Sequence, residues 1–390
     1  MPKDGPGLRR FAGWVLAVGL LCARLGSAMP TNVILFIGDG MGYGQIAAAG
    51  LYANGASGTL SFEAFPHQAQ VITSSADSTI TDSAAAATAM ATGYKVRNGI
   101  ISVARPGDGR QLQTVLEQAA AAGKATGLVT TTYISHATPA AFAAHEPSRG
   151  NYGQIAQDYL GQTRPNVLFG GSLYLSESDA AAAGYSVVKD AAQLQVLDTD
   201  GADFVSGQFA AGHMTYEFDR GPAATEPHLS EMTAVALSLL DNDPQGFFLM
   251  VEGGRIDHAA HAHDLERTIG ETLEFSRAVR AAVDWIHRSA LLDTLILVTA
   301  DHETGGLSIL ADGGAGRYPD VAWTSAGHTG ANVPIYAWGS NSAWVTDVTD
   351  NTWIHHVMTA GPRTVPVSGT LMLVSIGLVS MAWLRARRVL

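Results

Sequence analysis

Six short runs of almost uninterrupted apolar residues constrain the fold of this chain more than any other feature. Strands that face water on one side alternate between apolar and polar residues, whereas strands covered on both faces, as in parallel sheets, are apolar throughout. Segments with helical patterns separate the runs, which is the arrangement of an α/β fold. The expected strands are Asn32–Ile37, Gly127–Thr131, Val167–Phe169, Gly246–Val251, Leu295–Thr299 and Pro334–Trp338.

The segments between these strands carry the spacing of apolar residues that is typical of helices. Residues from about 172 to 225 are expected to form an elaboration with loops and not a separate domain. A single catalytic domain over residues 29–362 is therefore predicted, with enough apolar content for one sizeable core. The expected helices are Ala84–Ala91, Gln111–Ala122, Gly153–Leu160, Ser230–Leu240 and, with some interruption, Asp257–Ala290.

The start of the chain predicts a secretory signal peptide over residues 1–28. A lysine and two arginines precede the apolar run Phe11–Leu21, and the small residues Gly26-Ser27-Ala28 follow it. Cys22, the one cysteine of the chain, lies within this segment. The exported domain would therefore have neither disulfides nor thiolate metal ligands.

The end of the chain predicts a transmembrane helix. Val365–Leu384 is uncharged and has the length of about 20 residues that a bilayer span requires. Arginines in the tail 385–390 would keep that tail cytoplasmic and place the catalytic domain at the periplasmic or cell-envelope face. The pattern also resembles the sorting tails of exosortase-processed bacterial envelope proteins, but no Glu-Pro pair follows Pro366. A processed tail and a retained anchor both stay open.

The charge of the chain bears on its partners. A net charge of −12 without a basic stripe argues against nucleic acid as a partner. An anionic substrate is still compatible with this charge, because bound divalent cations reverse the charge locally.

Polar side chains follow most of the predicted strands, at the point where each strand ends. The carboxyl ends of the strands form the ligand-binding edge of an open α/β sheet, so these separate segments should converge there. The residues in question are Asp39, His136, Thr138, Glu252, Asp257, Asp301 and His302.

Two of these segments have the spacing of metal ligands. Asp257 and His261 are four residues apart, so on a helix both side chains point from one face toward one ion. Asp301 and His302 end an apolar strand, where a turn lets both reach a second ion. Zinc favours such mixed imidazole and carboxylate ligands. Asp39 lies in a glycine-rich turn that allows close backbone approach, but this turn lacks the Gly-Lys-Ser/Thr ending of a P-loop.

The segment Thr81-Asp82-Ser83 precedes an alanine-rich run and therefore predicts a helix N-terminus. The simplest role of these side chains is capping. The same position favours an anion, because backbone N–H groups and the positive end of the helix dipole point at it. Ser83 is thus either an ordinary cap residue or, with cations opposite it, a nucleophile.

In these segments the sequence resembles the alkaline phosphatase family. The matching pieces occur in the family's order between residues 32 and 330. They are NVILFIGDGMG (32–42), TDSAA (81–85), TGYKVRNG (92–99), SHATP (135–139), VEGGRIDH (251–258), VTADHE (298–303) and GHTG (327–330).

The resemblance implies a three-layer sandwich with a mostly parallel central sheet, two Zn²⁺ ions and one Mg²⁺ ion. The first zinc would take Asp257, His261 and His328 as ligands. The second zinc would take Asp39, Asp301 and His302. The magnesium would share Asp39 and take Thr138 and Glu252.

The resemblance also implies hydrolysis of phosphate monoesters through a phosphoserine on Ser83, by a homodimer. Arg149 matches the family's phosphate-clamping arginine and would be oriented by Asp82, with Arg220 and Arg255 as rivals. Zinc at Asp39, Asp301 and His302 would favour the alkoxide form of the serine.

One departure from the best-studied bacterial pattern leaves the third metal open. His136 stands where that pattern has Asp, and His258 stands where it has Lys. An imidazole near the third site weakens the preference for Mg²⁺, which favours oxygen ligands.

Two other functions stay open. A phosphodiesterase of the same superfamily usually lacks the third metal site and the clamping arginine, so Thr138 and Glu252 favour the monoesterase. A non-catalytic envelope protein that binds phosphate or metals would normally have lost the nucleophile or a ligand. A sulfatase is excluded, because no Cys/Ser-x-Pro-x-Arg motif is present.

Overall fold

A ten-stranded sheet runs through the part of the chain that the computed structural model describes, residues 29–289 and 293–360. The strand order is β14-β2-β13-β8-β1-β7-β3-β4-β6-β5. The strands are β1 (Asn32–Gly38), β2 (His67–Ile72), β3 (Ala125–Tyr133), β4 (Val167–Gly171), β5 (Ser186–Val188), β6 (Val205–Ala210), β7 (Phe247–Gly253), β8 (Thr294–Thr299), β13 (Val333–Gly339) and β14 (Val348–Asp350).

All six expected strands are present, and the central ones are parallel and buried along their whole length. β1 pairs in parallel with β7 on one side and with β8 on the other. The expected parallel direction is wrong for one strand. β13, which contains Pro334–Trp338, runs antiparallel to both β8 and β2. A continuous apolar run reports that a strand is covered on both faces and carries no information on its direction.

Four strands of the main sheet were not predicted from the sequence, because they are short or lie toward the edges of the sheet. β2 alternates between exposed and partly buried residues, with only Val71 fully buried, and β14 and β5 have three residues each. β5 and β6 fall within residues 172–225, so this segment is more than an elaboration with loops. It adds two strands to the sheet and belongs to the same compact unit as the rest of residues 30–359.

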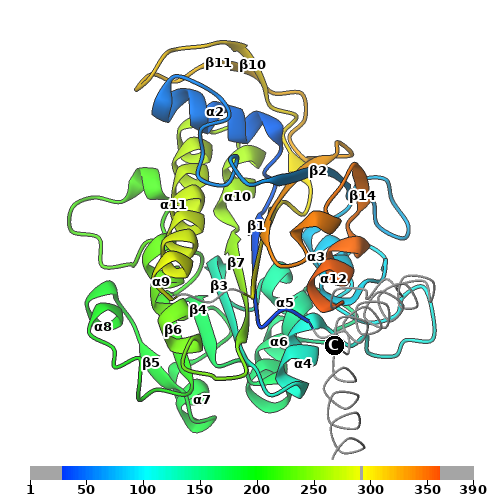
Figure 1. The fold of residues 1–390 in the computed structure, drawn as a ribbon, viewed down its shortest axis with the longest axis vertical. Coiled ribbons are helices and arrows are strands. Elements are labelled where there is room, and N and C mark those ends of the chain that lie inside the picture. Colours follow the sequence, from blue (N-terminus) through cyan, green and yellow to red (C-terminus); the bar gives the residue numbers. More distant parts are fainter. Residues whose placement is uncertain (1–28, 290–292, 361–390) are drawn as a thin grey trace, which may run out of the picture. The chain divides into compact units, whose positions relative to one another are not determined.

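Helices cover both faces of the sheet (Figure 1), which gives the expected three layers. On one face α9 and α11 pack on β1, β3 and β7, and α2 and α10 pack on α11. On the other face α4 and α5 pack on β3 and β7, and α3 and α12 pack on these helices. The helices are α2 (Tyr43–Asn54), α3 (Ser83–Thr92), α4 (Val115–Ala121), α5 (Ala137–Ala143), α9 (Leu229–Leu240), α10 (Arg255–His261), α11 (Leu265–Ser289) and α12 (Thr352–Thr359).

Shorter elements complete the described part of the chain. Two small antiparallel ribbons lie outside the main sheet, one formed by β9 and β12 and the other by β10 and β11. These elements are α6 (Tyr152–Asp158), α7 (Glu177–Ala182), α8 (Ala191–Gln195), β9 (Glu303–Thr304), β10 (Ser308–Ala311), β11 (Asp320–Ala322), β12 (His328–Thr329), a π-helix (Tyr159–Thr163) and 3-10 helices at Glu217–Asp219 and Ser342–Trp344.

The expected helices are present, with shifted ends. α4 begins four residues later than expected, because Thr114 and Glu117 form a capping box there. The expected interruption after Asp257 lies between α10 and α11, where His263 has a φ of 54°. α2, α5 and α12 were not expected.

No helix within the described ranges has both the length and the apolar character to cross a membrane. The predicted signal peptide (1–28), C-terminal helix (365–384) and basic tail (385–390) lie outside the residues that the structure describes.

Candidate metal centre and nucleophile

The polar residues that follow the strands do converge at one edge of the sheet. Asp39 follows β1 in a tight turn in which Gly40 has a φ of 71°. A Cβ atom at Gly40 would lie 2.9 Å from the Cα of Asp257 and equally close to the hydroxyl of Thr304. The glycine therefore lets the β1 turn pack directly against two other segments of the site.

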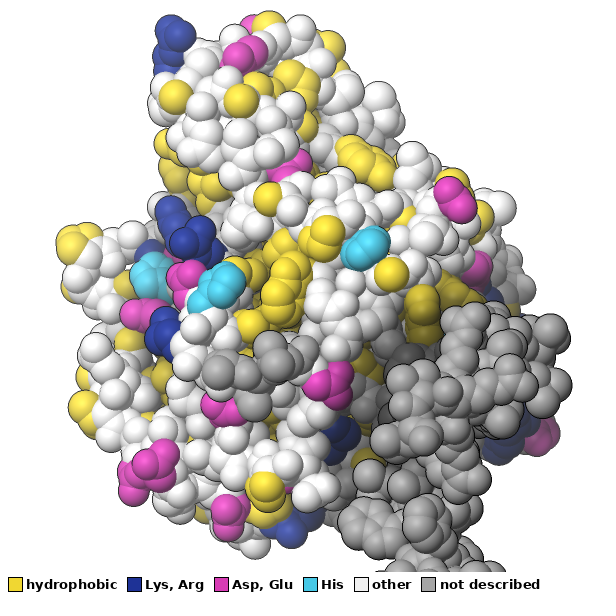
Figure 2. All heavy atoms as spheres, in the orientation of Figure 1, with side chains coloured by type: hydrophobic (Ala, Val, Ile, Leu, Met, Phe, Trp, Pro, Cys, Tyr) yellow, Lys and Arg dark blue, Asp and Glu magenta, His cyan; other side chains and the backbone are white. Residues whose placement is uncertain are grey.

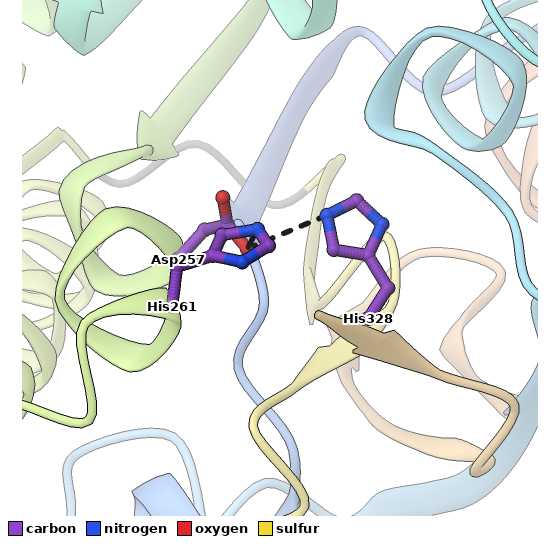
Figure 3. A group of neighbouring side chains, drawn as sticks. All are labelled: Asp257, His261 and His328. Atoms are coloured by element: carbon purple, nitrogen blue, oxygen red, sulfur yellow. Dashed lines mark ion pairs between the residues drawn. The ribbon is translucent and has the colours of Figure 1, made fainter. Parts of the chain in front are cut away.

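Asp257, His261 and His328 form the first group (Figure 3). The two residues from α10 lie one turn apart, and His328 comes from β12. Asp257 Oδ1 lies 3.3 Å from His261 Nε2 and 3.7 Å from His328 Nε2. The structure thus brings together all three ligands that the resemblance assigns to the first zinc.

The backbone fixes which nitrogen each of these histidines presents. Nδ1 of His261 lies 2.8 Å from the carbonyl oxygen of Ala326, and Nδ1 of His328 lies 2.8 Å from that of Thr81. A carbonyl only accepts hydrogen bonds, so both Nδ1 atoms carry the proton. Both Nε2 atoms therefore present a lone pair toward Asp257, which is the arrangement of metal-binding histidines.

Asp39, Asp301 and His302 form the second group, and all three are fully buried. His302 Nε2 lies 3.1 Å from Asp301 Oδ2 and 3.5 Å from Asp39 Oδ1. Those two carboxylate oxygens have no hydrogen-bond partner in the described part of the chain. Buried and unpaired anionic oxygens are costly, so this group fits a bound cation.

Thr304 connects the first two groups and was missed by the sequence analysis. Its hydroxyl lies 2.6 Å from Asp257 Oδ1, to which it donates, and 3.3 Å from His302 Nδ1. The hydroxyl can accept the Nδ1 proton of His302, which leaves the lone pair on Nε2. Only the proximity of Thr304 to Asp301 in the sequence could have suggested this role.

Asp39, Glu252 and His136 form the third group. Burial raises the pKa of Glu252 to about 7, and the hydroxyls of Thr130, Thr138 and Thr132 oppose this rise. Among the residues that the structure describes, Oε1 of Glu252 has no hydrogen-bond partner, and neither does Nδ1 of His136. The expected oxygen ligands thus lie together, and an imidazole lies among them.

The ionised carboxylates of the three groups repel one another. Burial raises the pKa of Asp39 well above its ordinary value, and the carboxylates of Asp301, Asp257 and Glu252 add to this effect. Burial also raises the pKa of Asp301 and lowers that of His302. A cluster of like charges in the interior requires cations to stay ionised near neutral pH.

Ser83 is the first residue of α3 and faces the second group. Its Oγ lies 3.4 Å from His302 Nε2 and 3.5 Å from Asp39 Oδ2. Asp82 caps the helix, because its Oδ1 accepts the backbone N–H of Ala85 at 3.0 Å. The N-terminal end of α3, which favours an anion, therefore points at the cation-binding edge.

Arg149 lies beside Ser83 and is held there by Asp82. Its Nη1 donates to Asp82 Oδ2 at 3.0 Å, and its Nη2 lies 3.5 Å from His136 Nε2. The backbone N–H of Gly99 donates to the same oxygen of Asp82 at 3.0 Å. The guanidinium is thus held between Asp82, the residue before Ser83, and His136 of the third group.

The two rival arginines are engaged elsewhere. Figure 2 shows basic, acidic and histidine side chains gathered on the left of this face, over the segment between β6 and α9. Arg220 belongs to that segment and pairs with Glu217 and Glu226. Arg255 lies 3.6 Å above the ring centroid of Tyr216 and donates to His258 Nδ1 at 2.9 Å. Neither guanidinium is directed at Ser83 by these contacts.

A cluster of histidines borders the third group, and the sequence analysis did not foresee it. The ring centroid of His213 lies 4.5 Å from that of His258 and 5.7 Å from that of His136. Burial lowers the pKa of His213 to about 3 and that of His258 to about 4, so both are neutral at physiological pH. His213 lies in the irregular segment after β6, where no motif marks it.

The three groups, the serine and the arginine together have the composition of a centre for phosphoryl transfer. Cations at the carboxylates neutralise anionic oxygens, a serine at a helix N-terminus provides a nucleophile, and an arginine binds non-bridging phosphate oxygens.

Comparisons with known proteins point the same way. A family model described as "Alkaline phosphatase" matches residues 30–172, 170–318 and 315–362. Alkaline phosphatase 3 of Bacillus subtilis (strain 168) is 34% identical, over 83% of this chain and 87% of that protein. Streptomycin-6-phosphate phosphatase of Streptomyces griseus is 35% identical, over 86% of this chain and 91% of its own length. The crystal structure of the cold-active alkaline phosphatase of Shewanella sp. superposes with a TM-score of 0.75 at 31% identity, over 84% of this chain and 98% of that one.

Proposed function

The chain belongs to the alkaline phosphatase family, and from this premise we propose that it hydrolyses phosphate monoesters through a phosphoseryl intermediate on Ser83. The observation that carries this proposal is the position of the serine hydroxyl. It starts a helix, lies within 3.5 Å of Asp39 and His302, and has Arg149 beside it. The relatives support the reaction class, since they are named for the removal of phosphate.

Two Zn²⁺ ions and one Mg²⁺ ion fit the donor groups. The first and second groups combine imidazole nitrogens with carboxylates, as zinc prefers, and the third group supplies the oxygens that magnesium prefers. When bound, such cations lower the pKa of a neighbouring hydroxyl and neutralise charge on the phosphoryl and leaving oxygens. His136 is the one donor that fits zinc better than magnesium at the third group.

The protein's own residues account for the positioning of the substrate. Arg149 binds two non-bridging oxygens of the phosphoryl group in a fork, and Asp82 holds the guanidinium in place. Ser83 Oγ forms a bond to phosphorus, the bond from phosphorus to the ester oxygen breaks, and the alcohol leaves. Water then cleaves the phosphoserine, which releases inorganic phosphate and restores the serine hydroxyl.

Acid trapping tests this assignment. The metal-loaded protein is incubated with inorganic phosphate, quenched in acid and digested, and the peptides are analysed by mass spectrometry. A phosphorylated peptide that contains Ser83 is the expected result, together with near-complete loss of turnover in Ser83→Ala at unchanged metal content and Tm. Turnover of Ser83→Ala near that of the wild type would refute the proposal.

A phosphodiesterase activity is the main rival. Arg149 and the third group favour the monoester, because a monoester has an additional anionic oxygen for the arginine to bind. The two are separated by the turnover of a nitrophenyl phosphate monoester and of the matching diester. Faster hydrolysis of the diester would reverse the choice, and no hydrolysis of either by the metal-loaded protein would favour a binding protein.

The substrate class, the oligomeric state and the location extend this proposal. The relative from Streptomyces griseus is named for the removal of phosphate from streptomycin 6-phosphate. A homodimer, and export to the periplasmic or cell-envelope face with a C-terminal membrane anchor, stay predictions.

A further inference from the structure

Three tyrosines pack together next to the arginine of the site. The rings of Tyr152 and Tyr174 are stacked, with centroids 4.9 Å apart and planes 20° from parallel. Tyr133, at the end of β3, touches both rings with its edge, at centroid distances of 5.4 and 6.1 Å. The side chain of Tyr174 is the outermost of the three, because this residue is 52% exposed.

This aromatic cluster is continuous with the phosphate-binding side of the centre. The ring of Tyr133 lies 5.2 Å from the ring of His136, whose Nε2 lies 3.5 Å from Arg149. Tyr152 begins α6, three residues after Arg149 in the sequence. An alcohol group that extends from a bound phosphoryl group on this side would therefore meet the tyrosines.

The backbone of Tyr174 is unfavourable for a residue of its size. The turn that holds it is closed by a hydrogen bond of 2.8 Å from the N–H of Leu175 to the carbonyl of Ser172. Tyr174 occupies the third position of this turn with a φ of 69°, where glycine or asparagine is favoured. Bulky residues rarely adopt such a conformation, and where they do, a functional role is a reasonable hypothesis.

A cavity borders Tyr174, the outermost residue of the cluster. It has a volume of about 510 Å³, and Tyr174 forms part of its wall. Small side chains of α6, the π-helix and α7 line it as well, among them Ala156, Gly161 and Ala182. This volume lies within the range of roughly 300–1,000 Å³ that small-molecule sites have.

We propose that Tyr152 and Tyr174 form an aromatic platform that binds the planar part of the substrate's alcohol, so that monoesters with a flat ring, such as nucleoside monophosphates, are preferred. Bases and aryl groups stack on tyrosine with little dependence on their substituents. This inference rests on the function proposed for the Ser83 centre, and it adds the class of alcohol.

Two substrates, one with an adenine base and one without it, test the platform. Adenosine 5′-monophosphate and ribose 5-phosphate both release a primary alcohol from the same carbon, so the chemistry at phosphorus is matched. The ratio of their kcat/KM values is expected to be roughly tenfold in favour of the nucleotide, mainly through KM. Tyr174→Gly should bring this ratio close to one, because the outer ring of the platform is lost.

The variants separate the platform from a structural role. Tyr174→Gly should keep or raise the Tm, because glycine suits a φ of 69°. Tyr174→Phe should keep the wild-type ratio, since it retains the ring. Tyr94→Ala is the matched control, because Tyr94 is 54% exposed and follows the C-terminal end of α3, the end opposite Ser83.

The possible outcomes are distinct. A wild-type ratio near one, or a ratio that Tyr174→Gly leaves unchanged, would overturn the platform while the proposed monoesterase stands. Failure of the metal-loaded wild type to hydrolyse either ester would refute the monoesterase and the platform with it.

Discussion

The carboxylate of Asp82 holds Arg149 with one oxygen and caps the helix of the nucleophile with the other. Oδ2 accepts from the guanidinium at 3.0 Å, and Oδ1 accepts from the N–H of Ala85, also at 3.0 Å. The guanidinium that we propose binds phosphate and the serine that we propose attacks it are therefore positioned by one side chain.

Substitutions at Asp82 should separate these two tasks. Asp82→Asn keeps an oxygen for the helix cap but loses the charge that holds Arg149, so inorganic phosphate should inhibit about tenfold more weakly, at a Tm close to that of the wild type. Asp82→Ala should weaken phosphate inhibition equally and also lower the free energy of unfolding by about 1 kcal/mol, because the cap is lost. Inhibition assays and thermal unfolding check this, and unchanged phosphate inhibition in both variants would contradict it.

Removal of the metals should destabilise the fold, and the effect of Asp39→Asn should change sign with metal content. Chelation leaves Asp39 buried among three other carboxylates that raise its pKa. The metal-free wild type should therefore lose stability as pH rises through that pKa, because only the unfolded carboxyl ionises freely.

In the metal-free protein, Asp39→Asn removes one of the repelling charges and should raise the free energy of unfolding by at least about 1 kcal/mol. In the metal-loaded protein it removes a ligand and should lower the Tm. Calorimetry with and without Zn²⁺ and Mg²⁺ tests this. The same sign of the effect in both states would argue against a cation at Asp39.

His136→Asp should change the metal preference of the third group. The substitution replaces a nitrogen donor with an oxygen donor beside Asp39 and Glu252, which suits Mg²⁺. We expect the Mg²⁺ concentration for half-maximal activity to fall about tenfold and the bound Mg²⁺, measured by elemental analysis, to rise. His213→Gln is the control, because His213 lies next to His136 but outside the ligand group. An equal response of both variants would rule out a direct role of His136.

Glu271→Gln should stabilise the protein increasingly at alkaline pH. Burial raises the pKa of Glu271 from 4.5 to about 8, and the N–H of Glu217 opposes this rise. The stability that the protonated side chain contributes is complete below pH 4.5 and is lost as pH rises through the folded pKa of about 8.

Glutamine keeps a neutral acceptor for the N–H of Glu217, so the gain over the wild type should be larger at pH 9 than at pH 5, by about 4 kcal/mol. Glu266→Gln, at an exposed position of the same helix, should keep the pH dependence of the wild type. Parallel pH profiles of Glu271→Gln and the wild type would show that Glu271 is ionised in the folded protein.

The sequence was sufficient to predict which polar side chains lie together wherever such a residue follows a parallel strand. Asp39 after β1 and Asp301 after β8 lie together because Phe36 and Val298 are partners in register, and the same register places Glu252 opposite Ile37. Burial on both faces makes such strands visible as apolar runs, and the parallel arrangement brings their ends to one edge.

Other features of the fold and of the site are not marked by any pattern in the local sequence. The direction of β13 depends on which neighbours it pairs with, and apolar content does not encode that choice. Thr304 and His213 act through contacts between distant segments, and Tyr174 looks like an ordinary loop residue until its φ is known. Tertiary packing determines these features, so a single sequence does not reveal them.

The reversed strand β13 has a consequence for how the protein matures. It inserts between β8 and β2, and among the described strands β2 has only β13 and β14 as neighbours. Val71 therefore gains its first sheet partner only when Val333, near the other end of the domain, has docked beside it. Such non-local pairing is slow to form. His328 lies just ahead of β13, so the last residue of the first group arrives with the strand that joins β2 to the rest of the sheet. Metal uptake at that group should therefore report the docking of this strand: a nascent or truncated chain in which β13 has not yet docked holds an incomplete first group.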